Sequence, residues 1–135
     1  MIRVKTLTVQ LIGAQPDRIR ICRIDGESLV TVVVPREDLA EAKSLPNIPQ
    51  RGVYYLLDED HGNVSRVYAG QTTQGIARLD AHKAKKEFWN KAVMFLDDDQ
   101  NISRDALDVL EAKAIDYVRT HGSYETDNSA TPKPY

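Results

Sequence analysis

The chain of 135 residues has very little of what marks several common protein classes. It holds one cysteine, Cys22, which excludes an internal disulfide framework and a zinc site built from cysteines. No apolar run approaches the roughly 20 residues that cross a bilayer. The N-terminal stretch MIRVKTLTVQLIG alternates polar and apolar residues and lacks the apolar block of a signal peptide. The sequence therefore predicts a cytoplasmic protein without a membrane segment.

An excess of positive charge is also missing. The chain has 18 Lys and Arg against 20 Asp and Glu, and its pI is about 5.9. A domain that coats nucleic acid non-specifically usually has a pI above about 9. The charge is unevenly spread, because residues 78–91 carry five basic and two acidic residues whereas residues 97–111 carry six acidic and one basic. Such segments are either solvated faces or a local anion contact, and charge alone leaves both interpretations open.

Several well-known site motifs are absent. The sequence has no G-x-x-x-x-G-K-[ST] loop, no G-x-G-x-x-G and no G-x-S-x-G elbow. His61, His82 and His121 lack zinc-like spacing, and the Asp97–Asp99 run lacks the glycine and distal glutamate of a calcium-binding EF-hand loop. A nucleotide-binding, zinc-binding or serine-hydrolase assignment would therefore have no motif to support it.

The pattern of apolar residues predicts an α+β protein. Alternation and β-branched runs indicate strands over 2–12, 18–24, 29–34, 52–58, 65–70 and 91–97. Helices are expected over 36–43, 74–86 and 103–121, with Thr72 or Thr73 and Ser103 as N-caps. We expect residues 1–49 to be a β-rich extension packed on a core of residues 50–135, which is a small, mainly antiparallel sheet flanked by helices.

The last predicted helix carries a misplaced carboxylate. Its apolar stripe contains Glu111 and is formed by Leu107, Leu110, Ala114, Ile115 and Val118. A buried, unpaired charge costs several kcal/mol, as an order of magnitude. Glu111 is therefore expected to be ion-paired, hydrogen-bonded, bound to a metal or placed at the rim of a cleft.

The preceding helix and strands hold further candidates. Arg78 and His82 are four residues apart and share a helix face that Lys86 continues, a pairing suited to an anionic ligand or simply to solvent. Tyr54 and Tyr68 lie on strands that should be neighbours, each close to a glycine that permits close approach of a backbone or ligand. Packing in the core is the alternative role for both tyrosines.

Taken together, these residues resemble the GIY-YIG nuclease superfamily. The segment 52–54 (GVY) is similar to the first signature of the family, and 68–70 (YAG) is similar to the second, with Ala in the middle place. Arg78, His82, Glu111 and Asn128 follow in the order of the family's catalytic arginine, the residue one turn later, the metal-binding glutamate and the late asparagine. The likeness spans about 52 to 128. The stretch KKEFWNKAVMF resembles a bacterial subgroup in which a strand-rich segment precedes the nuclease core and further domains often follow, so the chain is expected to be part of a longer protein with an additional C-terminal domain.

The resemblance implies a fold and an activity. The fold is a three-stranded antiparallel sheet flanked by helices. The activity is hydrolysis of nucleic-acid phosphodiester bonds, with DNA as the expected partner, by a metal-dependent endonuclease. A catalytically silent nucleic-acid-binding or protein-interaction module of the same fold is the alternative. Arg78 would stabilise charge on phosphorus, and Tyr54 would act as, or assist, the general base.

The resemblance also implies which residues form the site. A single Mg²⁺ or Mn²⁺ would bind Glu111, since one carboxylate and several waters suit these cations better than Zn²⁺. The expected catalytic residues are Tyr54, Tyr68, Arg78, His82, Glu111 and Asn128. The expected substrate-binding residues are Lys83, Lys86, Gly70 and Gln71.

Overall fold

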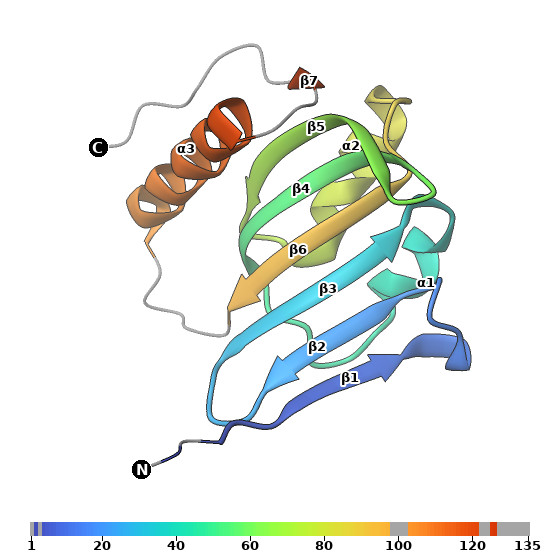
Figure 1. The fold of residues 1–135 in the computed structure, drawn as a ribbon, viewed down its shortest axis with the longest axis vertical. Helices are drawn as coiled ribbons and strands as arrows, with labels where there is room; N and C mark the ends of the chain where they lie inside the picture. Colours follow the sequence, from blue (N-terminus) through green and yellow to red (C-terminus); the bar gives the residue numbers. More distant parts are fainter. Residues whose placement is uncertain (1, 3, 98–102, 122–124, 127–135) are drawn as a thin grey trace.

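The computed structural model describes residues 2, 4–97, 103–121 and 125–126. They form a seven-stranded sheet with short helices behind it and a longer helix beside one end (Figure 1). In chain order the elements are β1 (Leu7–Leu11), η1 (Ile12–Ala14), β2 (Arg20–Ile24), β3 (Leu29–Pro35), η2 (Arg36–Asp38), α1 (Leu39–Lys43), β4 (Arg51–Asp60), β5 (Asn63–Thr72), η3 (Gly75–Arg78), α2 (Leu79–Lys85), β6 (Lys91–Asp97), α3 (Arg104–His121) and β7 (Glu125–Thr126).

The strand order in the sheet is β1-β2-β3-β6-β4-β5-β7. Neighbouring strands are antiparallel except the two-residue β7, which runs parallel to β5 beside Arg66 and Val67. The α+β class and the mainly antiparallel sheet predicted from the sequence are confirmed.

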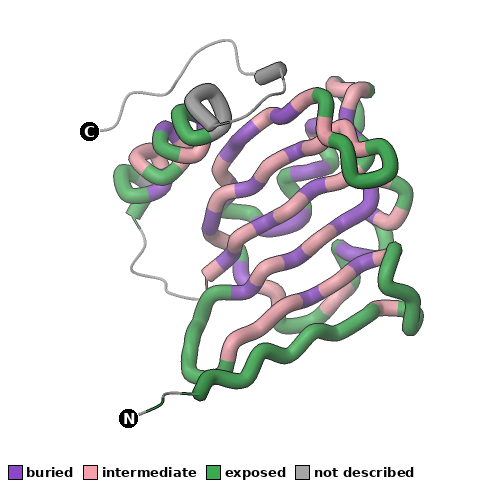
Figure 2. Tube along the Cα trace, in the orientation of Figure 1, coloured by how far each residue is buried: buried purple, intermediate pink, exposed green. Residues whose placement is uncertain are grey.

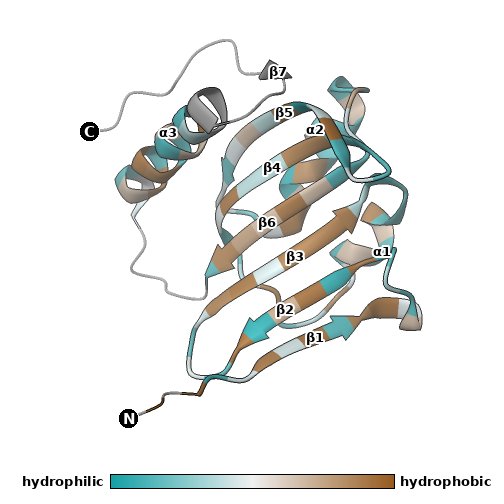
Figure 3. Ribbon diagram, in the orientation of Figure 1, coloured by the Kyte–Doolittle hydropathy of each residue, from teal (hydrophilic) through white to brown (hydrophobic). Residues whose placement is uncertain are grey.

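The predicted sheet of three strands is too small. The strands β6, β4 and β5 do form an antiparallel run, but β3 continues it by pairing with β6 from Leu29↔Asp97 to Pro35↔Lys91. The reason is the composition of β3, which is apolar on both faces and therefore gains most from a central place between two strands. Figure 3 shows the apolar character of β3 and of its neighbour β6. Residues 1–49 thus add β1, β2 and β3 to the same sheet.

The main core lies on the face of the sheet that α1, η3 and α2 cover. Every second residue of the central strands points into it, as the alternation of buried and half-buried residues in Figure 2 shows. The helical side is supplied by Leu39 and Ala42 of α1, Ile76 of η3 and Leu79 of α2, and Trp89 fills the space before β6. This core fixes η3 and α2 against the end of the sheet where β4 and β5 lie.

Helix α3 packs against the opposite face of β4 and β5. Tyr55, which alternates with the core residue Tyr54, donates a hydrogen bond of 3.3 Å from its hydroxyl to the carbonyl of Ala114. Ser103 caps the helix as predicted, because its Oγ accepts a 3.1 Å hydrogen bond from the amide of Ala106. The predicted apolar stripe is partly wrong: Leu110 is 45% exposed, and the buried residues of α3 include Ala112.

The far edge of the sheet is the most exposed part of the fold. All five residues of β1 are exposed, although Leu7, Val9 and Leu11 are apolar (Figure 2). Among the described residues, no helix has both the length and the apolar composition to cross a bilayer.

Candidate active site

The hairpin of β4 and β5 brings two tyrosines to the helix-covered face. Tyr54 pairs with Gly70 and Leu56 pairs with Tyr68, and residues opposite each other in an antiparallel pair point to the same side. A Cβ at Gly70 would lie only 2.5 Å from the Oη and 2.6 Å from the Cζ of Tyr54. Gly70, predicted to bind substrate, is therefore buried beneath the Tyr54 ring, and its lack of a side chain lets that ring cross β5.

Gly52, the glycine of segment 52–54, also has a packing role. A Cβ at Gly52 would collide with the backbone carbonyl of Phe95 in β6. Any side chain at this position would push β4 away from β6, which are neighbours in the sheet. The close approach expected from the glycines is thus to a backbone at Gly52 and to a tyrosine ring at Gly70.

Behind Tyr54 lies His82 of α2, buried with 5% of its surface exposed. Tyr54 Oη and His82 Nε2 are 2.6 Å apart and share a hydrogen bond. The imidazole also packs against Tyr68, with ring centroids 5.0 Å apart. His82 therefore joins the two tyrosines into one aromatic and hydrogen-bonded cluster.

Burial and nearby cations set the protonation of this cluster. Desolvation, together with the smaller effect of the positive charges of Arg78, Lys86 and Lys85, lowers the pKa of His82 from 6.5 to about 4. Desolvation also raises the pKa of Tyr54 above its ordinary value, reinforced by Tyr68 and opposed by Arg78. Near neutral pH the imidazole is uncharged and Tyr54 keeps its proton.

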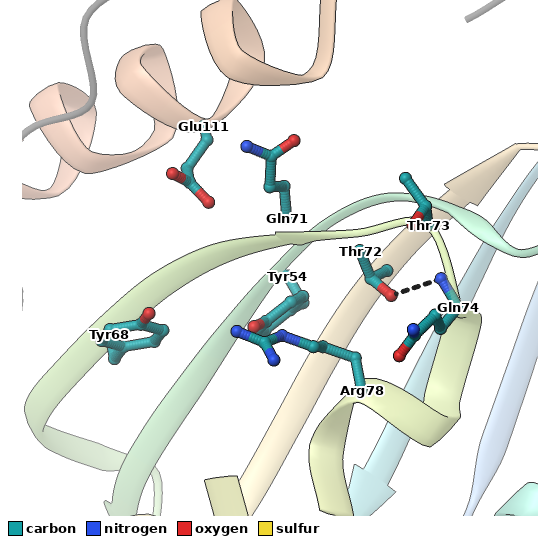
Figure 4. A pocket seen from close by; sticks show the side chains of 8 residues that line it. All are labelled: Tyr54, Tyr68, Gln71, Thr72, Thr73, Gln74, Arg78 and Glu111. Atoms are coloured by element: carbon teal, nitrogen blue, oxygen red, sulfur yellow. Dashed lines mark hydrogen bonds between the residues drawn. The ribbon is translucent and has the colours of Figure 1, made fainter. Parts of the chain in front are cut away.

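A cavity of about 410 Å³ opens beside the cluster, and we call it the tyrosine cavity. Its lining is almost entirely polar and comes from β4, β5, the turn after β5, η3 and α3 (Figure 4): Tyr54, Tyr68, Gln71, Thr72, Thr73, Gln74, Arg78 and Glu111. Arg78 is exposed at the end of η3, whereas Glu111 is half-buried and reaches the cavity from α3 on the other side of β5. A cation and a carboxylate thus face one polar space from two separate elements.

The turn between β5 and η3 contributes residues that sequence reasoning did not assign to the site. Thr72 Oγ1 accepts a 3.0 Å hydrogen bond from the amide of Gln74 (Figure 4). It also donates one of 3.1 Å to the carbonyl of Gly75. These bonds fix a tight turn that turns Thr73 and Gln74 toward the cavity. Thr72 and Thr73 had been expected only as helix caps, and their position at the end of a strand was the available signal.

Gln71 is held by a residue that sequence reasoning also missed. Its Nε2 donates a short hydrogen bond to the carboxylate of Asp108, which lies one turn before Glu111 on α3. The Oε1 of Gln71 is buried and has no hydrogen-bond partner in the part of the chain that the structure describes. The hydrogen bond to Asp108 therefore ties this end of β5 to α3 beside the cavity.

The remaining predicted residues divide by location. Lys86 places its Nζ 4.5 Å from the ring centre of Tyr68, so it lies at the cluster. Lys83 does not line the tyrosine cavity and instead lines a separate one beside Arg36 and Lys91. Asn128 lies outside the described residues.

Arg36, from the N-terminal third of the chain, fixes the end of α2. Its guanidinium donates hydrogen bonds to the carbonyls of Lys83 (2.7 Å), Lys86 (2.6 Å) and Trp89 (3.2 Å). It also stacks over the indole of Trp89, 4.7 Å from the ring centre. Since these carbonyls close the helix that carries His82, Arg36 positions the cluster without lining the tyrosine cavity.

The tyrosine cavity contains few side chains that could hold a cation. Among the described residues, no group of three or more His, Cys, Asp or Glu is arranged to hold a metal ion. The carboxylate in the lining of the tyrosine cavity is that of Glu111. A hard cation that keeps most of its waters fits such a sparse oxygen set, whereas Zn²⁺ would require more protein ligands.

Comparisons with known proteins returned nothing similar: no protein-family model, no curated protein and no solved structure matches the chain. The geometry of the tyrosine cavity and the pattern of the sequence are the observations on which a function can be proposed.

Proposed function

We propose that this chain is a metal-dependent endonuclease that hydrolyses nucleic-acid phosphodiester bonds at the tyrosine cavity, with a GIY-YIG-like site. The observation that carries the proposal is that Tyr54, Tyr68, Arg78 and Glu111 line one cavity although 57 residues of sequence separate the first from the last. They come from four different elements, so proximity along the chain does not explain their meeting.

Arg78 supplies the electrostatic part of the reaction. Its guanidinium carries a fixed positive charge and a fork of donors that matches two phosphate oxygens. The exposed end of η3 gives it access to a phosphodiester in the cavity. In the pentavalent transition state more negative charge collects on these oxygens, and Arg78 stabilises that state more than the ground state.

Tyr54 and His82 together handle the proton of the attacking water. A tyrosine whose pKa is raised is a poor base by itself, because it keeps its proton near neutral pH. The neutral imidazole of His82 can accept that proton at Nε2, 2.6 Å away. As water attacks phosphorus, its proton passes to Tyr54 Oη while the Tyr54 proton passes to His82. Because burial disfavours the imidazolium, His82 then gives the proton back through Tyr54 to the departing oxygen and returns to its neutral form. Tyr68 packs against the same imidazole and lines the cavity in which the water would attack.

Glu111 is the residue that would hold the divalent cation. When bound, Mg²⁺ or Mn²⁺ supplies Lewis-acid stabilisation of the leaving oxygen. The assignment is supported by the position of Glu111, a half-buried carboxylate at the wall of a polar cavity that Arg78 also lines.

The test is cleavage of a nucleic-acid panel that includes single strands, duplexes, flaps and junctions of DNA and RNA. We expect the wild type to cut at least one substrate with Mg²⁺ or Mn²⁺ and none in EDTA. Arg78→Ala should lower the rate roughly 10²–10³-fold, as removal of a comparable stabilising donor does. Lys113→Ala removes an exposed cation from α3 and is the matched control, expected to cut normally. Binding without cleavage across the whole panel would favour the catalytically silent binding module.

A further inference from the structure

A second cavity of about 270 Å³ adjoins the tyrosine cavity, and the two share Gln74 in their linings. It lies between the segment that follows α1 and the start of η3. Its apolar wall includes Leu45, Ile48 and Ile76. Its polar side contains Lys43 and three amide side chains, those of Asn47, Gln50 and Gln74, and we call it the amide cavity.

The walls of the amide cavity are held in place by hydrogen bonds. The carbonyl of Gln50 accepts a 2.8 Å bond from the amide of Gly75. The side-chain Nε2 of Gln50 donates a 3.2 Å hydrogen bond to the carbonyl of Ile48. This bond fixes the orientation of the Gln50 amide, whose Oε1 is a hydrogen-bond acceptor. Arg23 of β2 donates to the carbonyl of Asn47 at 3.2 Å. Gly75 has φ +61° and its Cβ position is closed by Pro49 and Gln50, so glycine permits this close approach.

The combination of aliphatic walls and amide side chains indicates the chemistry of the ligand. A nucleobase presents flat apolar faces and an edge of alternating donors and acceptors. Amide side chains match such edges, with one donor group and one acceptor group each. A dry cavity of roughly 150 Å³ accepts benzene, so 270 Å³ leaves room for a purine ring.

The small number of cations in the cavity linings favours a nucleobase, rather than a run of backbone phosphates, as the ligand of the amide cavity. The cations that line the two cavities are Arg78 and Lys43, and Lys43 is engaged in a 2.8 Å ion pair with Asp80. A site that follows a duplex backbone needs many more basic contacts, each of which also makes binding salt-dependent. Lys86 and Arg23 lie nearby, but they contact the Tyr68 ring and the Asn47 carbonyl. The linings themselves therefore favour a contact other than a run of phosphates.

We propose that the amide cavity binds the unpaired base of a nucleotide next to the phosphodiester at Arg78. The substrate is then single-stranded or locally unpaired DNA, because a paired base would have to leave the duplex stack before it could enter the cavity. This inference rests on the proposed function, since it takes the tyrosine cavity as the place of the phosphodiester. In this proposal, the side chains of Asn47, Gln50 and Gln74 give the protein its preference for unpaired nucleotides.

The test measures binding of fluorescent oligonucleotides in EDTA, where cleavage is prevented. One probe is a single strand of mixed sequence and the other is the same strand in a perfect duplex. Gln50→Ala removes one amide, and Asn47→Gly removes another while tolerating the positive φ of +61° at that position. Gln10→Ala, an exposed amide on the distant strand β1, is the matched control. Thermal melts establish that each variant is folded.

We expect the wild type to bind the single strand at least about tenfold more tightly than the duplex. Each amide-cavity variant should weaken single-strand binding by about tenfold or more, in the range that a good amide–base contact gives, and leave duplex binding unchanged. Equal loss on both probes, or unchanged single-strand binding by folded variants, would overturn the inference while leaving the nuclease proposal intact. If the wild type binds neither probe and cuts no substrate in the panel above, the proposed function itself fails.

Discussion

The hydroxyl of Tyr54 and Nε2 of His82 lie 2.6 Å apart inside the protein, where burial keeps both groups uncharged near neutral pH. The contact joins a strand to a helix across 28 residues of sequence. It also connects the tyrosine cavity to a buried proton acceptor that solvent does not reach freely. The first prediction follows from the cost of charging that acceptor.

His82 should make the protein less stable in acid. Its pKa is about 4 in the folded chain and 6.5 in the unfolded chain, so between these values only the unfolded chain binds the proton. The stabilisation by the neutral imidazole is fully present above pH 6.5 and is lost as the pH falls through 4. Allowing for partial solvent screening, we expect a loss on the order of 2 kcal/mol in the free energy of unfolding.

Denaturant unfolding between pH 4 and pH 7 measures this effect when wild type is compared with His82→Gln. Taking the difference between the two proteins cancels the titration of the carboxylates. The advantage of the wild type should shrink toward pH 4. A difference that stays constant over this range, or grows in acid, would show that His82 is not a buried neutral group.

Gly70→Ala should displace the Tyr54 ring. The added Cβ would lie 2.5 Å from Tyr54 Oη, far inside contact distance, and the ring would have to leave its place beside His82. We expect a loss of about 1–3 kcal/mol in the free energy of unfolding, as overpacking of a core typically costs. In a Tyr54→Leu background the ring is gone, so the same substitution should cost far less. Equal costs in the two backgrounds would place the strain elsewhere.

Arg36→Lys should loosen the end of α2. A lysine keeps the charge but loses the planar fork that bonds three backbone carbonyls. We expect the free energy of unfolding to fall by about 1–3 kcal/mol and the amides near the end of α2 to exchange faster with solvent. Arg18→Lys alters an arginine whose partners are two side-chain carboxylates, the half-buried Asp38 and the exposed Glu41, which a lysine can also pair with, and it should cost at most about 1 kcal/mol. Similar costs for the two variants would mean that Arg36 is an ordinary surface cation.

Local patterns in the sequence were sufficient to predict most elements of the fold. The alternation of apolar residues placed a strand at 91–97, where β6 lies, and Ser103 marked the start of α3. The predicted helix 74–86 is instead a 3-10 turn followed by α2, because Gly75 adopts φ +61° before the helix can begin. Patterns of this kind depend on neighbours within a few residues, which a sequence displays directly.

Long-range relationships could not be read in the same way. The pairing of β3 with β6, which makes the sheet larger than predicted, joins segments about sixty residues apart. The position of α3 against β4 and β5 decides that Leu110 is exposed and that Glu111 reaches the tyrosine cavity. Arg36 closes α2 from fifty residues away, and no local pattern signals such a contact. The residue types and their order were sufficient to propose candidates such as Tyr54, Tyr68, Arg78 and Glu111, which line one cavity, but not to predict the contacts that hold them there.

The most direct test of the account is the rate of Mg²⁺-dependent cleavage by Glu111→Gln relative to wild type, on whichever substrate the wild type cuts. Asp105→Asn neutralises an exposed carboxylate on the same helix and serves as the matched control. If Glu111 holds the cation, Glu111→Gln should lose at least roughly 10²-fold in rate while melting as cooperatively as the wild type, and Asp105→Asn should cut normally. Cleavage by folded Glu111→Gln at the wild-type rate would contradict the assignment of the tyrosine cavity as a metal-dependent nuclease site.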